Sequence, residues 1–221
     1  MIKAVIFDLD GTLANTIYDL HKAMNSMLDR LGYKRRTIAD LTKFINNGMR
    51  EFVRRSLPRD VQNVDFILES AVQIYAEEYE KCYCEKTVAY PGIEAMLMEL
   101  KSRGYKIAVL SNKQDSFVKE IIYKLFDKKI FTEVRGQSNL PPKPNPSSIF
   151  ALCKAMGVKP NKCVYVGDSD VDVETSINAG TKLIAVNWGY RKEDVLREAG
   201  ALYVASKPED VVELVKELAT Y

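Results

Sequence analysis

Two carboxylates directly follow an apolar segment near the start of this chain. Residues 4–7 are apolar and predict a short buried strand, and Asp8 and Asp10 come immediately after it. Gly11 then allows the chain to turn sharply. Ligands of α/β proteins bind beyond the carboxyl ends of the strands. The two acids therefore predict one site that holds both a nucleophile and a proton donor.

Short apolar strands alternate with helices along the carboxyl-terminal part of the chain. In chain order we expect helix 93–103, strand 107–110, helix 116–126, helix 146–156, strand 164–166, strand 183–186, strand 202–204 and helix 208–219. Such alternation is typical of a parallel sheet with helices on both faces. The predicted fold is therefore an α/β fold whose core is a Rossmann-like, doubly wound parallel sheet.

The segment between the first strand and this alternating part has helical periodicity. Apolar side chains in it recur at spacings of three and four, from Leu20 and Met24 onward. We therefore expect an α/β core of residues 1–15 and 88–221, interrupted after its first strand by a helical cap of residues 16–87. Because the insertion follows the two acids at once, it should lie over the site as a lid.

The overall composition shows no bias toward nucleic acid or lipid. The 221 residues include 32 basic and 30 acidic ones, and 47% are hydrophobic. No apolar run is long enough to span a membrane, and the chain enters a strand at once, which argues against a signal peptide. The four cysteines lack Cys-x-x-Cys spacing, which favours reduced, structural thiols. We expect a cytoplasmic protein without nucleic-acid or membrane partners, either a monomer or a weak homodimer.

Polar residues also follow other predicted strands. Ser111 and Asn112 come directly after one strand, and Asp168 and Asp172 come after another, while Lys143 lies in a proline-rich loop. Because the carboxyl ends of parallel strands meet at one edge of a sheet, these side chains should lie close together. Acids, one hydroxyl, one isolated lysine and free backbone amides suit phosphoryl transfer, which needs a nucleophile, charge neutralisation and a proton donor.

This set of elements resembles the haloacid dehalogenase superfamily, specifically its Mg²⁺-dependent phosphatase branch. The resemblance implies that Asp8 is the nucleophile that forms an aspartyl-phosphate, and that Asp10 is the general acid and then the base that activates water. It also implies phosphate contacts from Leu9, Asp10, Ser111, Asn112 and Lys143, Mg²⁺ ligands from Asp8, the Asp10 carbonyl and Asp168, and supporting roles behind them for Asp172 and Thr12. Oxygen-only ligands of this kind suit Mg²⁺.

Several of these residues also have a purely structural interpretation. Asp168 suits a helix N-cap, and Asp170 and Asp172 suit the first turn of a helix. We favour the structural role for Asp170 and the functional role for Asp172. We expect Lys113 to be solvated and Thr12 to hydrogen-bond within its turn.

The helical insertion carries a second likeness, to the phosphoglycolate phosphatases of this superfamily. The segment that begins at Asn15 resembles their Asp-Ser-x-x-Asp-Leu pattern, with Asn in place of the first Asp. The segment from Asn46 to Gly48 resembles their Gly-x-Gly loop, with Asn in place of the first Gly. Gly48 is expected to let the lid backbone approach the substrate. Arg50 is either a ligand for a substrate carboxylate or a solvated helix arginine.

These patterns predict a Mg²⁺-dependent phosphatase that hydrolyses a small phosphorylated metabolite, most like phosphoglycolate. A sugar phosphomutase of the β-phosphoglucomutase type is the closer alternative, but those enzymes carry a lid histidine that the chain's only histidine, His21, misses by one position. Hydrolysis of pyrophosphate or nucleotides uses the same chemistry and stays open. Dehalogenation is disfavoured because hydrolytic dehalogenases lack the second acid, here Asp10. A non-catalytic binding protein predicts a broken motif, and none is broken.

Overall fold

The core of the molecule is a six-stranded parallel sheet. The computed structural model describes residues 1–220. Its strand order is β5-β4-β1-β6-β7-β8, and every neighbouring pair is parallel. The strands are β1 Ala4–Phe7, β4 Lys106–Gln114, β5 Glu133–Gln137, β6 Cys163–Gly167, β7 Lys182–Val186 and β8 Val204–Ala205. The predicted fold class, a doubly wound α/β sheet, is confirmed.

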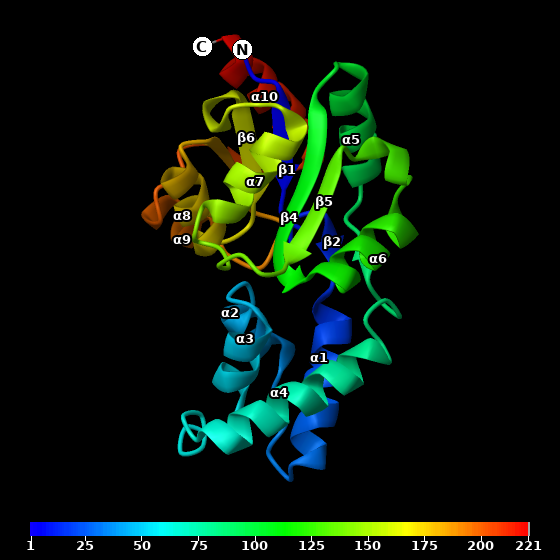
Figure 1. Ribbon diagram of the computed structural model, residues 1–221, viewed down its shortest axis with the longest axis vertical. Coiled ribbons are helices and arrows are strands. Elements are labelled where there is room, and N and C mark those ends of the chain that lie inside the picture. The colour runs from blue at the N-terminus through cyan, green and yellow to red at the C-terminus, as the bar shows by residue number, and fades with distance from the viewer. Residues whose placement is uncertain (221) are drawn as a thin grey trace.

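Helices cover both faces of this sheet (Figure 1). The helices of the core are α5 Ile93–Ser102, α6 Asp115–Leu125, α7 Ser147–Met156, α8 Asp170–Ala179, α9 Glu193–Glu198 and α10 Pro208–Thr220, with 3-10 turns η1 Lys128–Ile130 and η2 Pro160–Lys162. The central strand β1 shows why both faces are needed. Val5 and Phe7 pack with α5, α6 and α10, whereas Ala4 and Ile6 pack with α7 and α8. Because alternate residues of a strand point to opposite faces, a continuous apolar strand is stable only between two helical layers.

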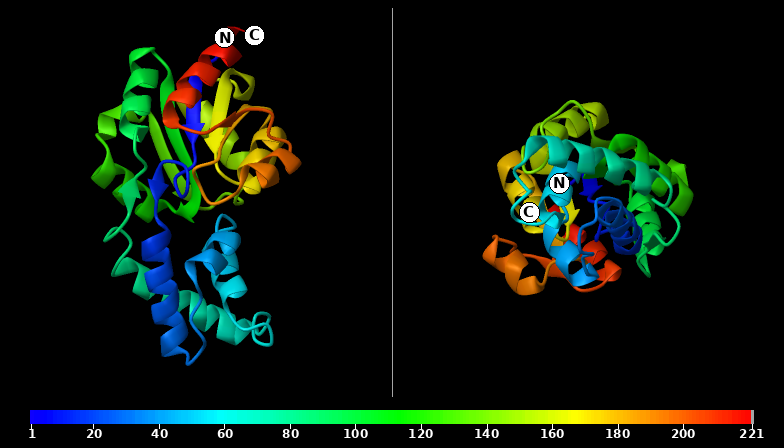
Figure 2. Two further views of the ribbon diagram at one scale, coloured as in Figure 1. Left: turned by 180° about the vertical axis from the view of Figure 1, so that it is seen from behind. Right: turned by 90° about the horizontal axis from the view of Figure 1, so that it is seen from below.

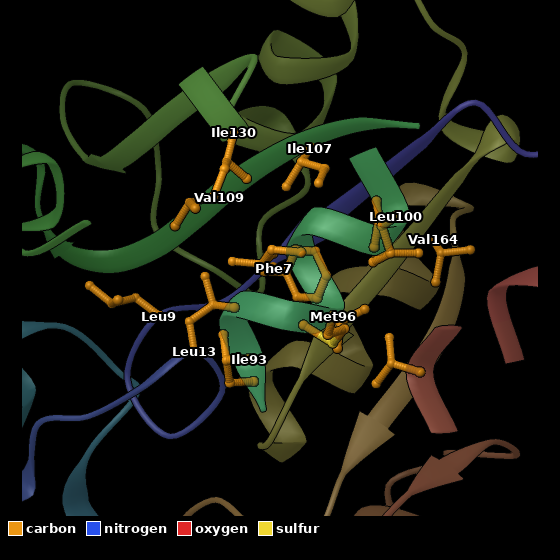
Figure 3. Packing of buried hydrophobic residues seen from close by; sticks show 14 of the residues in the cluster. Phe7, Leu9, Leu13, Ile93, Met96, Leu100, Ile107, Val109, Ile130 and Val164 are labelled. Carbon is orange, nitrogen blue, oxygen red and sulfur yellow. The ribbon is translucent and has the colours of Figure 1, made fainter. Parts of the chain in front are cut away.

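The apolar cluster between the sheet and α5, α6 and α10 also anchors the loop that follows β1. Leu9 and Leu13 are fully buried in the same cluster as Phe7, against Ile93 and Met96 of α5 (Figure 3). The loop that carries Asp8 and Asp10 is thus fixed by apolar packing on both sides of its turn.

A separate group of four helices lies beyond the carboxyl ends of the strands. These helices, which we call the cap, are α1 Ile17–Arg30, α2 Ile38–Phe44, α3 Met49–Ser56 and α4 Asp65–Glu80. They enclose an apolar cluster of their own, whose fully buried members include Met24, Leu28 and Tyr75. The arrowheads of β4 and β5 point toward α2 and α3 in Figure 1, and the view from below in Figure 2 shows the cap across that end of the sheet.

The chain passes between core and cap through one short antiparallel ribbon. β2 Ala14–Asn15 leads into the cap and pairs with β3 Val88–Ala89, which leads out of it. Beside the ribbon, the buried Asp19 of α1 accepts hydrogen bonds from the backbone amides of Lys86 and Thr87 and from the Thr87 hydroxyl, at 2.7–3.0 Å. The two passages are therefore tied to each other as well as to the cap.

Some elements differ from the predictions. β5 was not predicted, because the sequence Glu-Val-Arg-Gly-Gln has no continuous apolar character and the strand forms an edge of the sheet. α9 and the ribbon were also not predicted. β4 continues to Gln114, with a shift in its pairing register after Leu110, so Ser111 and Asn112 belong to an irregular strand end rather than to a loop.

No helix within residues 1–220 combines the length and the apolar character that crossing a membrane requires.

The packing of α5 gives a stability prediction with a matched control. Leu97 is fully buried in the core cluster, whereas its neighbour Met98 is 56% exposed. Leu97→Ala should lower the free energy of unfolding by about 2–5 kcal/mol, because it leaves a cavity that the helix and sheet cannot close. Met98→Ala should change it by less than about 0.5 kcal/mol. Urea unfolding of both variants measures this, and equal effects would contradict the described packing.

Candidate active site

Asp8 and Asp10 stand on either side of the turn that ends β1. The Asp8 amide donates to the Val166 carbonyl at 2.9 Å, so Asp8 still belongs to the sheet. The Leu9 carbonyl then accepts from the amides of residues 12, 13 and 14. Gly11 adopts φ +85°, in the region that favours glycine. This tight turn presents both carboxylates at the edge of the sheet.

Lys143 bridges two of the buried carboxylates. Its Nζ lies 3.0 Å from Asp8 Oδ1 and 2.7 Å from Asp172 Oδ1, and it donates to the Tyr165 hydroxyl at 3.0 Å. The side chains of Lys143, Asp8 and Asp172 are almost completely buried. Burial alone would lower the pKa of the lysine, but the charges of Asp172 and Asp8 outweigh it, so the pKa lies well above its usual value. The lysine is therefore a permanent cation beside Asp8.

Asp172 holds this lysine from behind. Its Oδ1 accepts from Lys143 and from the Tyr165 hydroxyl, and its Oδ2 accepts from the Ser169 hydroxyl at 2.6 Å and the Ser169 amide at 3.1 Å. Asp172 and Ser169 together form the capping box at the start of α8. The structural and functional interpretations of Asp172 thus coincide, because the capping box of α8 fixes the carboxylate that pairs with Lys143.

Asp168 lies in a cradle made by the turn after β1 and the loop after β7. Its Oδ1 accepts from the Thr12 hydroxyl at 3.1 Å and its Oδ2 from the Tyr190 amide at 2.7 Å. A side chain on Gly11 or on Gly189 would overlap the Asp168 carboxylate. Burial, together with the charge of Asp172, raises the pKa of Asp168 to about 7. Thr12 therefore supports Asp168 rather than only its own turn.

The buried carboxylates have the arrangement of a site for a divalent cation. Oxygen atoms of Asp8, Asp168 and Asp172 lie within 4.8 Å of one another. Lys143, 3.0 Å from Asp8 Oδ1, supplies only one positive charge to these three acids. Burial, reinforced by Asp172 and Asp168, raises the pKa of Asp8 well above its usual range. A hard cation with oxygen ligands would neutralise the excess negative charge.

Asp10 has partners that the sequence did not indicate. Its Oδ1 accepts from the Thr16 hydroxyl at 2.5 Å and lies 2.8 Å from Lys113 Nζ. The Thr16 hydroxyl also contacts the hydroxyl of Tyr190. The prediction that Lys113 is solvated is wrong, because its side chain is 7% exposed and bound to Asp10. The burial of Lys113 depends on Tyr79 of α4, a contact that the local sequence of β4 does not indicate.

Ser111 and Asn112 have different surroundings. The Ser111 hydroxyl oxygen accepts only from the Lys113 amide within residues 1–220, at 3.2 Å, so its own hydrogen is left for a ligand. The Asn112 side chain is fully engaged with its neighbours. It accepts from the Lys143 amide at 2.8 Å and donates to the Lys143 and Asn46 carbonyls, both at 3.0 Å. The Asn112 side chain thus joins β4, the Lys143 loop and the cap.

One pocket connects these groups with the cap. It encloses about 510 Å³, its open mouth included, and is lined by Asp8, Asp10, Leu20, Ile45, Asn46, Gly48, Met49, Phe52, Tyr75, Tyr79, Ser111, Asn112, Lys113, Gln114 and Lys143. Gly48 therefore reaches the pocket as expected. Arg50 does not line it, because its guanidinium turns outward and pairs with Glu69 at 2.9 Å.

Arg191 and the backbone of the cap hold the cap over the pocket. Arg191 donates to the carbonyls of Thr42 and Ile45 at the end of α2 and pairs with Asp170 at 3.1 Å. Asp170, for which we favoured a structural role, is half exposed and pairs with this arginine.

The match to known proteins decides the family. The family model described as haloacid dehalogenase-like hydrolase matches residues 5–186. The chain belongs to this family. The predicted family and the predicted enzyme class, a hydrolase, are confirmed.

Individual members of the haloacid dehalogenase-like family resemble the chain over almost its full length. A phosphoglycolate phosphatase of Psychrobacter arcticus is 33% identical over 202 residues, which are 89% of this chain and 88% of that protein. One of Aquifex aeolicus is 32% identical over 97% of both chains. The crystal structure of a putative phosphoglycolate phosphatase from Lactobacillus delbrueckii subsp. bulgaricus superimposes with a TM-score of 0.90 at 29% identity, and covers 96% of this chain and 98% of that one.

The raised pKa of Asp168 predicts a pH-dependent stability. In the folded protein Asp168 keeps its proton up to about pH 7, whereas in the unfolded chain it loses it near pH 3.8. Between about pH 4 and pH 7 the folded protein binds this proton and the unfolded chain does not, so the free energy of unfolding of the wild type falls as the pH rises. Asp168→Asn lacks this loss, so the Tm of the variant minus that of the wild type should increase between pH 5 and pH 8 in metal-free buffer. Thermal melts at both pH values measure it, and a constant difference would contradict the raised pKa.

Proposed function

We propose that this protein is a phosphatase that hydrolyses a small phosphorylated metabolite of the phosphoglycolate type, with Mg²⁺, through an aspartyl-phosphate on Asp8. The observation that carries the proposal is the buried carboxylate of Asp8, which lines a capped pocket, pairs with one buried ammonium group and lies close to two further carboxylates. This arrangement concentrates positive charge and a nucleophile at one point, which phosphoryl transfer requires.

In the first step an Asp8 oxygen attacks the phosphorus atom. The bond between phosphorus and the ester oxygen breaks, its electron pair goes to that oxygen, and the oxygen takes a proton from Asp10. Ser111 and Lys143 hold the phosphoryl oxygens meanwhile. In the second step Asp10 takes a proton from water and the water oxygen attacks the phosphorus. The bond between phosphorus and the Asp8 oxygen breaks, which releases inorganic phosphate and restores the Asp8 carboxylate.

Asp8, the Asp10 carbonyl and Asp168 would hold the Mg²⁺, which when bound neutralises charge on the phosphoryl oxygens and on Asp8. Asp172 pairs with Lys143 at 2.7 Å and is fixed by the capping box of α8, so we assign it to holding Lys143 in place.

The names of the relatives support the substrate class, since two proteins that match this chain at 32–33% identity are phosphoglycolate phosphatases. The mutase alternative receives no support from the cap. His21 bonds to Asn25 and the Arg36 carbonyl and is not among the residues that line the pocket.

Replacement of the nucleophile tests the chemistry. Asp8→Asn should lower kcat for phosphoglycolate by at least about 10³-fold, because the amide cannot form the phosphoenzyme. Asp65→Asn is the matched control, since the Asp65 side chain is 93% exposed at the far end of the cap. Phosphate release with Mg²⁺ measures both. Near wild-type turnover by Asp8→Asn would rule out the assigned nucleophile, and release of an isomer instead of phosphate would favour the mutase.

Magnesium should stabilise the fold as well as support activity. Mg²⁺ binds the native site but not the unfolded chain, so it should raise the Tm of the wild type at pH 8. It should raise the Tm of Asp168→Asn much less, because one ligand has lost its charge. Melts with and without Mg²⁺ measure this without any substrate. Equal increases in both proteins would remove Asp168 from the metal site.

A further inference from the structure

Lys113 is a buried cation on the cap side of the pocket. Its Nζ lies 2.8 Å from Asp10 Oδ1 and donates to the Tyr79 hydroxyl of α4 at 2.7 Å. It also stands over the Tyr79 ring, 4.8 Å from its centre. An ammonium group has three N–H donors. The described part of the chain shows partners for two of them, and the third is left for a ligand in the pocket that Lys113 lines.

The charges around the pocket make Lys113 the cation for a second anionic group on a substrate. The charged residues among those that line it are Asp8, Asp10, Lys113 and Lys143. Lys143 is already bound between Asp8 and Asp172 at the phosphate end. The cap contributes a mostly apolar wall, in which Leu20, Ile45, Met49, Phe52 and Tyr75 take part. A second anionic group on a substrate would therefore find its cation at Lys113.

Asn46 provides an independent observation on the same side of the pocket. The residue is 8% exposed, and its amide nitrogen Nδ2 is buried with no hydrogen-bond partner within residues 1–220. Its backbone is fixed, because its carbonyl accepts from the Asn112 side chain at 3.0 Å. Its φ of +87° is one that asparagine tolerates better than most residues. An unpaired buried donor is costly, and an acceptor oxygen on a ligand would remove that cost.

We propose that Lys113 and Asn46 form the subsite for a carboxylate on the leaving group, so that the enzyme selects short phosphomonoesters with a carboxylate close to the ester oxygen. This rests on the proposed function. Asp10 serves the ester oxygen, and Lys113 contacts Asp10 directly. The carboxylate bound by Lys113 is therefore only a few bonds from that oxygen. A longer ester would carry its anionic group past the lysine, toward the apolar wall.

The test compares two substrates of the same length, 2-phosphoglycolate and ethyl phosphate, which has a methyl group in place of the carboxylate. Lys113→Met removes the cation and keeps most of the volume. We expect it to lower kcat/KM for phosphoglycolate by about 10- to 100-fold, the range for a buried hydrogen bond to a charged group. The ratio of kcat/KM for phosphoglycolate to kcat/KM for ethyl phosphate should fall by at least about 10-fold, and a loss common to both substrates reports the contact of Lys113 with Asp10. Lys119→Met is the matched control, because Lys119 pairs with Asp115 outside the pocket, and it should change neither value.

Asn46→Asp tests the second half of the subsite and keeps the test decisive if Lys113→Met does not fold. Aspartate has the same shape and also tolerates a positive φ, but it places a negative oxygen where the amide donor was. It should reduce the preference for phosphoglycolate over ethyl phosphate by at least about 10-fold. Equal losses on both substrates in these variants would overturn the subsite, as would a wild type that does not distinguish the two substrates. A wild type that releases no phosphate from either would overturn the proposed function itself.

Discussion

The buried ammonium group of Lys143 is the interaction on which the rest of the site depends. It lies between the end of β1 and the first turn of α8, at 3.0 Å from Asp8 and 2.7 Å from Asp172. An unpaired charge at this depth would cost several kcal/mol, so lysine and acids must be buried together or not at all. Its backbone is held in turn by the Asn112 side chain of β4. Lys143 thus connects the ends of β1 and β4 with the start of α8. The negative charge that it leaves uncompensated makes the site receptive to a cation.

The cap meets this charged edge partly through its backbone groups. Arg191 and Asn112 of the core donate to cap carbonyls at Thr42, Ile45 and Asn46. Carbonyl groups are present whatever the side chain, so these contacts position the cap without constraining which residues face the pocket. The side chains that line the pocket are therefore not fixed by these contacts.

The sequence could foresee what depends on the sheet and not what depends on how the cap lies against it. Residues at separate strand ends were expected together because parallel strands end at one edge, and the structure does bring Asp8, Ser111, Lys143 and Asp168 to it. Lys113 escaped prediction because its burial requires Tyr79, from a helix 34 residues earlier in the chain. Arg50 suited a substrate carboxylate by its chemistry, but the rotation of α3 about its axis, which periodicity alone does not fix, turns it to Glu69.

The paired ribbon beside Asp19 limits how the two layers of this molecule can move. Both passages of the chain cross at β2 and β3 and are hydrogen-bonded to each other and to α1. Sliding or twisting of the cap would break these bonds, whereas bending across the ribbon would keep them. Displacement would then be greatest on the side farthest from the ribbon. Substrate would enter there, where the contacts of Arg191 with the cap and of Asn112 with Asn46 would separate. The Thr16 contact with Asp10, close to the bend, would change least.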